Sequence, residues 1–479
     1  MFSKSLHLFG RCVVLFGYGE IMAEEFTDEI AKEIEEEQVL SWKEALRHSK
    51  LPIIVWLVFI TTFFACTFGG GGFLGYSVAG YAWIICLAFA VMVIPANIDR
   101  ISFPLSIWLP WLLFVIISGY MSDYTNLQRS TLLLCPIVVG MASSTARVDA
   151  KQLLNFGLVV KLFSLAVLIL AFFLTGLLLT GQLPSSTALA PQAITATILA
   201  AFFASGYSFG RVRDLFWWSA IALLPVVALT RMAIFATGLS LPATFAPMKL
   251  QTRMILMVIV ALLGLALFYS PRVQEKMFMK GEGSLSDIGD PNNLATSGRR
   301  YMAGILLTEI AEKPIWGHGA NASEDLILKL TEGRLTHPHD DWLRFLYDYG
   351  VVGTTVFLFT LIFQVRHLLK KARHSEGEIR TLFFAAASTF LPFVLMMFTD
   401  NIVLYAAFYG NLQFMIMGLA YSAEKRSRLE RISYEDDAFY RRLRRRTSRS
   451  MIYREDEHVP EDESVTPEQE SGEEESGNR

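Results

Sequence analysis

The sequence predicts an all-α, polytopic integral membrane bundle of about twelve spans with a large loop on one side. Hydrophobic residues make up 53% of the 479-residue chain and charged residues only 18%, which is low for a soluble protein. Between Leu51 and Ser270 there is no glutamate, and there are only four aspartates and ten lysines or arginines. Apolar runs of spanning length recur through this stretch and again from residue 350.

The apolar runs divide the chain into five parts. We expect an N-terminal cytoplasmic segment (1–50), a membrane domain of about nine spans (51–270), a large loop (271–349), three further spans (350–421) and a disordered or weakly helical cytoplasmic tail (422–479). The expected spans lie at 51–69, 75–95, 101–121, 130–146, 162–181, 189–207, 215–230, 232–248, 254–270, 350–365, 381–399 and 402–421.

The two ends of the chain carry most of its charge. Residues 1–21 are either a cleaved signal or the product of a start assigned too early, with Met22 the true start, and residues 23–50 are typical of an acidic amphipathic helix. The tail has a basic cluster from Arg441 to Arg449, followed by eleven acidic residues from Glu455 to Glu475. It is either a solvated tail or a segment that binds anionic lipid headgroups.

The distribution of basic residues predicts the orientation. With a cytoplasmic N-terminus, the inside loops hold most of the lysines and arginines, as the positive-inside rule requires. Apart from Arg231, Arg129 is the only basic residue in the short outside loops. The loop 271–349 is then outside the membrane. The basic residues of the inside loops are Arg100, Arg147, Lys151, Arg211, Arg213, Lys249, Arg253, Arg366, Lys370, Lys371 and Arg373.

Residues 215–248 contain a single charged residue, Arg231, in 34 positions. One straight helix of this length would extend about 51 Å, far beyond the thickness of the hydrocarbon core. We therefore expect two spans that turn near Thr230 and Arg231, with Arg231 on the side of the large loop. Such an arginine usually lines a cavity or an ion path, and snorkelling to the headgroups is the alternative.

The large loop contains a predicted amphipathic helix that begins at Arg299 and Arg300. Its apolar residues Met302, Leu306 and Ile310 recur at helical spacing, so it should pack on the membrane domain. Free N–H groups and the dipole at a helix N-terminus favour an anion, and arginine forks match phosphate oxygens. We interpret both arginines as phosphate ligands; the alternative is surface arginines paired with acids such as Glu309 or Asp287.

The segment "THPHDDW" (336–342) leads into the span at 350–365. His339, Asp340 and Asp341 should occupy the first turn of a helix that Thr336 could cap, and His339 is then a candidate general base. His337 and Asp340 are candidate supporting residues. A structural role for His339, an ordinary i,i+3 pair of Asp341 with Arg344, and a metal site formed by these residues are the alternatives. H-x-H-D-D is not a specific metal spacing, so we expect neither a metal nor another cofactor.

The four cysteines, Cys12, Cys66, Cys86 and Cys135, lie in apolar runs and are interpreted as core residues.

Three motifs in order resemble the shared C-terminal region of O-antigen ligases and O-antigen polymerases. "ALTRMAIFA" resembles the segment that opens this region, "TSGRRYMAG…KPIWGHG" its middle, and "GHGANASEDLILKLTEGRLTHPHDDWLRFLYDYGVVGTTVFLF" its histidine-containing end. The resemblance covers residues 225–365. Two positions depart from the family pattern: Thr230 stands where serine is common before the arginine, and Asp340 where asparagine is common after the histidine.

The resemblance implies an inner-membrane glycosyltransferase similar to integral-membrane type C enzymes, with its active site facing the periplasm. It implies a polyprenyl-pyrophosphate-linked glycan donor, an acceptor hydroxyl on lipid A-core or on another glycan, and inversion at the anomeric carbon without a metal. Arg231 and Arg299, with Arg300 beside them, would bind the pyrophosphate, and His339 would deprotonate the acceptor. Besides the substrates we expect the lipid bilayer as a partner and no nucleic acid.

Three functions remain open from the sequence. We favour a ligase that joins a finished polysaccharide to a lipid-core sugar. A polymerase that joins lipid-linked repeat units shares the same motifs. A transporter of an anionic substrate, with Arg231 in its path, is the alternative of another class, and it should have internal repeats and broken helices.

Overall fold

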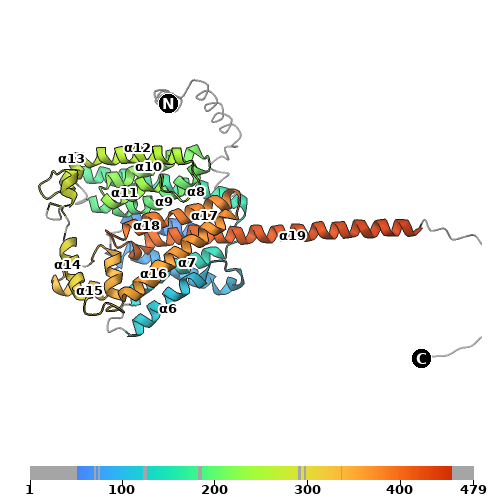
Figure 1. The fold of residues 1–479 in the computed structure, drawn as a ribbon, viewed down its shortest axis with the longest axis horizontal. Coiled ribbons are helices and arrows are strands. Elements are labelled where there is room, and N and C mark those ends of the chain that lie inside the picture. Colours follow the sequence, from blue (N-terminus) through green and yellow to red (C-terminus); the bar gives the residue numbers. More distant parts are fainter. Residues whose placement is uncertain are drawn as a thin grey trace, which may run out of the picture. The chain divides into compact units, whose positions relative to one another are not determined.

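The computed structural model describes residues 51–68, 72–73, 76–121, 127–181, 186–289, 293–295, 298–335 and 337–455, which are mostly helical. Contacts divide the chain into two compact units, Met1–Lys425 and Arg426–Arg479. The described part of the first unit is a helical bundle (Figure 1), as the sequence predicts. Its described strands form one small antiparallel hairpin, β1 (Gly72–Phe73) and β2 (Tyr76–Ser77). The expectation for residues 1–50 lies outside the described residues.

Each apolar run before the large loop contains a helix. The bounds are α4 (Ile53–Phe68), α5 (Val78–Val93), α6 (Leu105–Met121), α7 (Leu127–Ser144), α8 (Ala150–Leu179), α9 (Ala190–Ser208), α10 (Val212–Val227), α11 (Arg231–Ser240) and α12 (Leu250–Phe268), with short 3₁₀ helices at Pro95–Arg100 and Ser186–Leu189. Asp149 caps α8 reciprocally with Gln152, which fixes where this 30-residue helix begins.

The remaining helices build the large loop and the C-terminal part. They are α13 (Pro271–Met277), α14 (Arg299–Ile310), α15 (Ala322–Leu330), α16 (Asp341–Arg373), α17 (Gly377–Ser388), α18 (Phe390–Met396) and α19 (Asn411–Glu455), with short helical turns at Leu285–Gly289, Ile402–Leu404 and Ala406–Gly410. The last of these is a π-helix, and it leads directly into α19. The expected run 381–399 is therefore two helices, α17 and α18, and the run 402–421 begins with irregular turns.

Four helices among the described residues are long and apolar enough to cross a membrane: Lys151–Leu179, Leu250–Phe268, Asp341–Arg373 and Gly377–Met396. Three shorter apolar helices accompany them: Ile53–Thr67, Ala79–Val93 and Leu105–Tyr120. The expected span 232–248 differs most from the structure, because α11 ends at Ser240. Ten residues of α-helix extend only about 15 Å, which is half of the hydrocarbon thickness.

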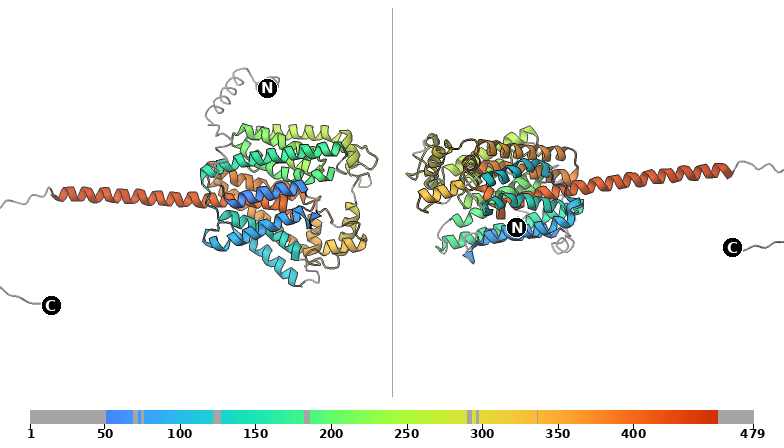
Figure 2. Two further views of the ribbon diagram at one scale, coloured as in Figure 1. Left: turned by 180° about the vertical axis from the view of Figure 1, so that it is seen from behind. Right: turned by 90° about the horizontal axis from the view of Figure 1, so that it is seen from below.

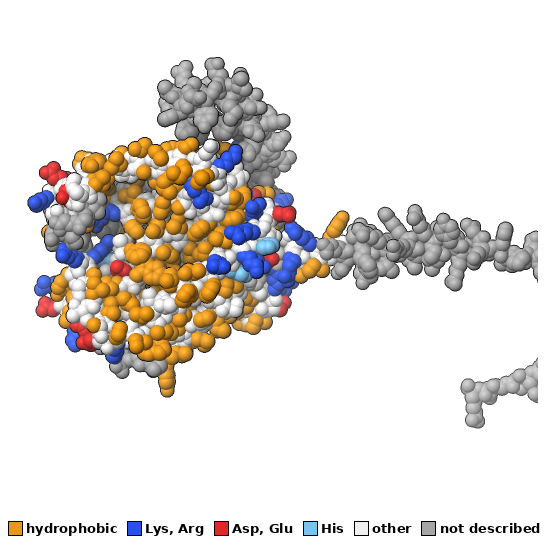
Figure 3. All heavy atoms as spheres, in the orientation of Figure 1, with side chains coloured by type: hydrophobic (Ala, Val, Ile, Leu, Met, Phe, Trp, Pro, Cys, Tyr) orange, Lys and Arg blue, Asp and Glu red, His pale blue; other side chains and the backbone are white. Residues whose placement is uncertain are grey.

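The bundle of the first unit has two distinct ends. Helices α13, α14 and α15 gather at one end, which we call the loop end (Figures 1 and 2). At the opposite end, Arg211 pairs with Glu378, and the Lys371 ammonium lies 3.0 Å from a Glu424 carboxylate oxygen. Hydrophobic side chains cover the middle of the face seen in Figure 3, and charged side chains gather toward both ends. This distribution is typical of a protein that spans a bilayer.

Two hydrophobic cores stabilise the first unit. The large one runs through the bundle and includes the described cysteines Cys66, Cys86 and Cys135, which are buried and free; their interpretation as core residues is confirmed, and Cys12 lies outside the described residues. The small core lies at the loop end and joins α14, α15 and the start of α16. It comprises Met302, Leu306, Ala322, Ile327 and Tyr347.

One expectation for the loop end is confirmed, and one for the C-terminal tail is corrected. Helix α14 buries Met302 and Leu306 in the small core as predicted, and it packs on α16, one of the candidate membrane spans. Helix α19 continues to Glu455, where a disordered or weakly helical tail was expected from residue 422. Helix-forming residues and i,i+4 ion pairs such as Arg426–Glu430 favour this continuation. Residues 456–479 lie outside the described residues.

Candidate functional site

The turn between α10 and α11 presents Arg231 at the loop end. Helix α10 ends at Val227, Leu229 has a left-handed φ of 51°, and α11 begins at Arg231. The predicted turn near Thr230 and Arg231 is thus present. Arg231 is half-buried, and its Nη2 donates a hydrogen bond to the Ala295 carbonyl oxygen at 3.2 Å. Arg231 therefore contacts the large loop directly.

The chain around α13 places Lys276 beside the same loop segment. The Ala295 N–H donates to the Met277 carbonyl at 2.9 Å, and Met279 N–H donates to Asn293 at 2.9 Å. The N–H of Ala295 thus binds Met277, the residue after Lys276, and the carbonyl of Ala295 binds Arg231. Lys276 was not among the candidates from the sequence, because a lysine in a polar loop has no distinguishing local pattern.

Helix α14 separates the two arginines with which it begins. Gly298, with a left-handed φ of 81°, precedes Arg299, which is half-buried. Arg300 is exposed and lines a shallow depression with Tyr301 and Gly304. Successive helical residues point about 100° apart, so the two guanidinium groups diverge.

The three cations Arg231, Lys276 and Arg299 influence one another electrostatically. Burial lowers the pKa of Arg231, and the charge of Arg299 lowers it further. Partial desolvation lowers the pKa of Lys276, and the charges of Arg231 and Arg299 add to this effect. Among the described residues, none of the three forms an ion pair with a carboxylate. Mutually repelling cations are stabilised when an anion binds between them.

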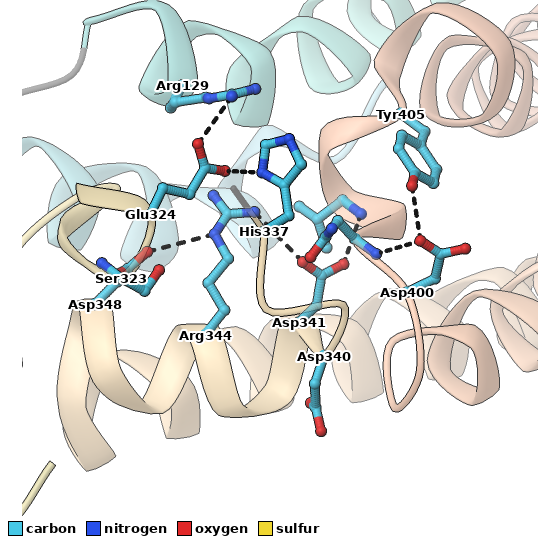
Figure 4. A network of polar contacts seen from close by, with 12 residues as sticks. Arg129, Ser323, Glu324, His337, Asp340, Asp341, Arg344, Asp348, Asp400 and Tyr405 are labelled. Carbon is cyan, nitrogen blue, oxygen red and sulfur yellow. Dashed lines mark hydrogen bonds and ion pairs between the residues drawn. The ribbon is translucent and has the colours of Figure 1, made fainter. Parts of the chain in front are cut away.

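His339 precedes α16 in a strained turn. It has a left-handed φ of 52°, and its side chain is 38% exposed, so a substrate can reach it. The predicted helix start is corrected: α16 begins at Asp341, and Asp340 is the N-cap, accepting a hydrogen bond from Leu343 N–H at 2.9 Å. Asp340 points away from the Asp341–Arg344 pair in Figure 4. The expected cap, Thr336, lies outside the described residues.

Asp400 faces the imidazole of His339. The His339 Nδ1 lies 3.5 Å from Asp400 Oδ1, and the Tyr405 hydroxyl donates to the same oxygen at 2.7 Å. Although burial raises the pKa of Asp400, its contacts with His339 and Tyr405 hold that pKa below the usual value. The same Nδ1 also lies 3.5 Å from the Asn401 amide nitrogen. In the tautomer with its hydrogen on Nδ1, directed at the carboxylate, Nε2 can accept a proton, which is the arrangement of an oriented general base.

Tyr405 lies beside the His339–Asp400 pair. Its hydroxyl donates to Asp400, and the Arg299 charge acts on it through space. The contacts among Tyr405, Asp400 and His339 therefore lie at the same end of the bundle as Arg231 and Arg299. Asp400 and Tyr405 were missed, although Asp400 is the single acidic residue between Glu378 and Glu424. Asp400 is a lone charge in an apolar run, as Arg231 is, and could have been selected on the same ground.

A buried ion network supports this end of the bundle (Figure 4). Arg344 is fully buried between Asp341 and Asp348, each 3.4 Å from one of its nitrogens; the predicted i,i+3 pair of Asp341 and Arg344 is confirmed. Asp348 accepts the Ser323 N–H at the start of α15 at 2.8 Å, and Asp341 accepts the Val403 N–H at 2.9 Å. The network thus ties α15, α16 and the Asp400–Tyr405 segment together.

His337 belongs to a neighbouring ion-pair network. Its Nδ1 lies 2.9 Å from Glu324 Oε1, and Arg129 of α7 lies 2.8 Å from Glu324 Oε2. Although burial raises the pKa of Glu324, the contact with His337 and the nearby charges of Arg344 and Arg129 lower it below its usual value. The rings of His337 and His339 are 6.5 Å apart. His337 therefore anchors the turn that carries His339.

The Gly-His-Gly segment has a structural role. Gly317 and Gly350, both with positive φ, lie so close that a Cβ on Gly350 would collide with the Ile315 carbonyl oxygen. Gly319 N–H donates to the Asp348 carbonyl at 2.7 Å, and Val351 N–H to the Pro314 carbonyl at 2.9 Å. These bonds hold the segment against the kink of α16 at Gly350, close to the buried network.

In the part of the chain that the structure describes, no three His, Cys, Asp or Glu side chains gather in a possible metal site.

Residues 215–358 match the family model described as O-antigen ligase. The match contains Arg231, Lys276, Arg299 and His339, whereas Asp400 and Tyr405 lie beyond it. No curated protein matches the chain. The predicted resemblance to O-antigen ligases and polymerases is confirmed over these residues, in a helical protein with apolar helices long enough to cross a membrane.

Proposed function

We propose that this protein is an inner-membrane glycosyltransferase that moves a glycan from a polyprenyl diphosphate donor to an acceptor hydroxyl. One observation carries the proposal: cations without carboxylate partners among the described residues lie at the same end of the bundle as an accessible His–Asp pair. The family match and the apolar helices support a lipid-linked substrate. An anionic leaving group needs cationic groups, and a hydroxyl acceptor needs a base.

In the proposed reaction, the acceptor oxygen attacks the anomeric carbon from the side opposite the diphosphate. The bond from the anomeric carbon to the phosphate oxygen breaks, and its electron pair stays on that oxygen, which inverts the anomeric centre. His339 Nε2 takes the acceptor proton, while Asp400 orients the ring and stabilises the imidazolium that forms. Arg231 and Arg299 bind the diphosphate. The reaction needs no metal in this scheme, because a diphosphate held by cations is already a good leaving group.

We further propose that the loop end faces the periplasm and that the opposite end faces the cytoplasm. The basic residues at the α9–α10, α11–α12 and α16–α17 connections support this orientation, because these connections lie at the opposite end. In this arrangement 51–270 and 350–421 form the membrane part, 271–349 is the periplasmic loop, and the segments 1–50 and 422–479 are cytoplasmic. Arg300 and the depression beside it would then be accessible from the periplasm.

A ligase acting on a lipid A-core sugar remains the favoured form of the proposal, and a polymerase acting on lipid-linked repeat units is its alternative. The transporter alternative has one supporting feature, the irregular segment from Asp400 to Gly410. Two of its carbonyls, those of Ala407 and Phe408, accept hydrogen bonds from Thr62 and Thr195. Carbonyls that are already bound to side chains are less able to coordinate a transported ion. The irregular segment is therefore better explained by a structural role than by transport.

The experiment that tests the proposal uses His339→Ala in cells lacking the native gene, with His374→Ala as the control. His374 is exposed at the opposite end, where its Nδ1 contacts the Lys370 carbonyl. We expect His339→Ala to lose surface glycan and to accumulate lipid-linked donor, while His374→Ala behaves as wild type. Loss of attachment with long chains still made identifies a ligase, and loss of chain length identifies a polymerase. Unchanged glycan in His339→Ala would remove His339 from catalysis.

A further inference from the structure

Lys276 lies where a third cation would complete the diphosphate site. The backbone of Ala295 joins the residue after Lys276 to Arg231, since its N–H binds the Met277 carbonyl and its own carbonyl accepts from Arg231. The isolated bridge between Phe278 and Leu294 holds the same two segments together. This pairing sets the position of Lys276 relative to Arg231.

The local structure of α13 makes that position definite. Gln274 is buried, and its side chain donates to the Phe268 carbonyl at 2.8 Å and accepts from Gly283 N–H at 2.7 Å. These two bonds anchor α13 to the end of α12 and to the loop that follows. Lys276 lies on the exposed part of the same short helix, so its ammonium is accessible to a ligand.

The charge of the reactants explains why a third cation is useful. In a lipid-linked donor the diphosphate is a diester with one ionised oxygen on each phosphorus. When the anomeric bond breaks, the electron pair adds negative charge to the terminal phosphate, so the leaving lipid diphosphate carries more charge than the donor. A cation that meets this additional charge binds the transition state and the product more tightly than the donor, which raises the rate.

We propose that Lys276 completes a three-cation site with Arg231 and Arg299 and stabilises the charge that develops on the leaving lipid diphosphate. This inference rests on the proposed function, because it assigns a role in the same reaction. The lowered pKa of Lys276, which the two arginines help to cause, agrees with a position facing both of them. Lys276 is therefore a diphosphate ligand in addition to the two arginines that the sequence predicts.

The test compares Lys276→Gln with Lys276→Arg, using Lys280→Gln as a matched control. Lys280 lies four residues further along the chain and is exposed. Its charge acts on the carboxylate of Asp287. Each purified protein is placed in phosphatidylcholine nanodiscs, and binding of polyprenyl diphosphate and of polyprenyl monophosphate with the same chain is measured. Thermal unfolding of each variant is recorded to verify that the protein is folded.

We expect Lys276→Gln to weaken diphosphate binding about ten- to a hundredfold and monophosphate binding less, since one charge-assisted contact is lost. Lys276→Arg should retain most of the affinity, and Lys280→Gln all of it. If Lys276→Gln and Lys280→Gln bind polyprenyl diphosphate equally well while Arg231→Gln binds it more weakly, the role of Lys276 is overturned and the proposed function stands. If the wild-type protein binds neither lipid, the proposed function is overturned together with this inference.

Discussion

The two ends of the bundle use charge differently. At the opposite end Arg211 pairs with Glu378 and Lys371 with Glu424, and each of these four side chains remains about a quarter to a third exposed. At the loop end Arg231, Lys276 and Arg299 lie close enough for their charges to repel, and among the described residues no carboxylate forms an ion pair with them. Paired charges neutralise each other, whereas clustered cations without a counter-charge cost free energy until an anion binds. This difference is why we place the proposed site at the loop end.

The loop end also separates two kinds of charged group. Arg344, Asp341 and Asp348 are fully buried, and their contacts are made within the protein. Arg231, Lys276, Arg299 and His339 are accessible. The buried network holds the elements that carry the accessible groups, so stability and activity should respond differently when each set is changed.

The largest effect is expected for Arg344→Met. Removing the guanidinium leaves two buried carboxylates without their cation, which typically destabilises a protein by about 3–5 kcal/mol. Thermal unfolding of the purified protein in detergent measures this loss. The same substitution combined with Asp341→Asn and Asp348→Asn should recover part of the stability, because asparagine still accepts from Val403 and Ser323 N–H groups. An Arg344→Met protein as stable as wild type would show that the network is not structural.

A smaller but selective effect is expected for Arg231→Gln. Loss of one cation at the leaving group should reduce the transfer rate about 10²- to 10³-fold, as for other groups that stabilise developing charge. The rate of glycan transfer from lipid-linked donor is the measurement, with stability recorded in parallel. Arg211→Gln at the opposite end is the control, since it removes a cation that is paired with Glu378 and lies away from the proposed site. Equal transfer rates for Arg231→Gln and Arg211→Gln would show that the two ends do not differ in function.

Local patterns in the sequence predicted part of this site. Arg231 was selected because a lone charge in 34 residues demands a turn at the membrane surface, and Arg299 because it begins an amphipathic helix. Every predicted apolar run contains a helix, since hydrophobicity over about 20 residues is a strong signal. The short α11 and the irregular start of α19 were not predicted, because hydropathy does not distinguish a full span from a broken one.

Other parts of the site depend on contacts between distant segments. Lys276 gains its position from the pairing of residues 277–279 with 293–295, which no local pattern encodes. Asp400 contacts His339, which lies 61 positions earlier in the sequence. The sequence does not predict this contact, although it does show that Asp400 is isolated among apolar residues. Asp340 was predicted as helical and is the cap, because caps and first turns favour the same acidic residues.

The smallest predicted effect concerns Glu324, which links α7 to the loop through Arg129 and His337. Its pKa is lower in the folded protein than in the unfolded chain, so its contribution to stability is present above the usual value of about 4.3 and is lost as the pH falls through the lowered folded pKa. Glu324→Gln should cost about 1–3 kcal/mol at neutral pH, and the difference from wild type should shrink between about pH 5 and pH 3. Thermal unfolding across this range measures it, and Glu332→Gln, whose pair with Arg334 is exposed, should show no such convergence. A difference that stays constant with pH would mean that the Glu324 carboxylate is bound by hydrogen bonds that glutamine can also accept, and that its charge does not tie the loop to the bundle.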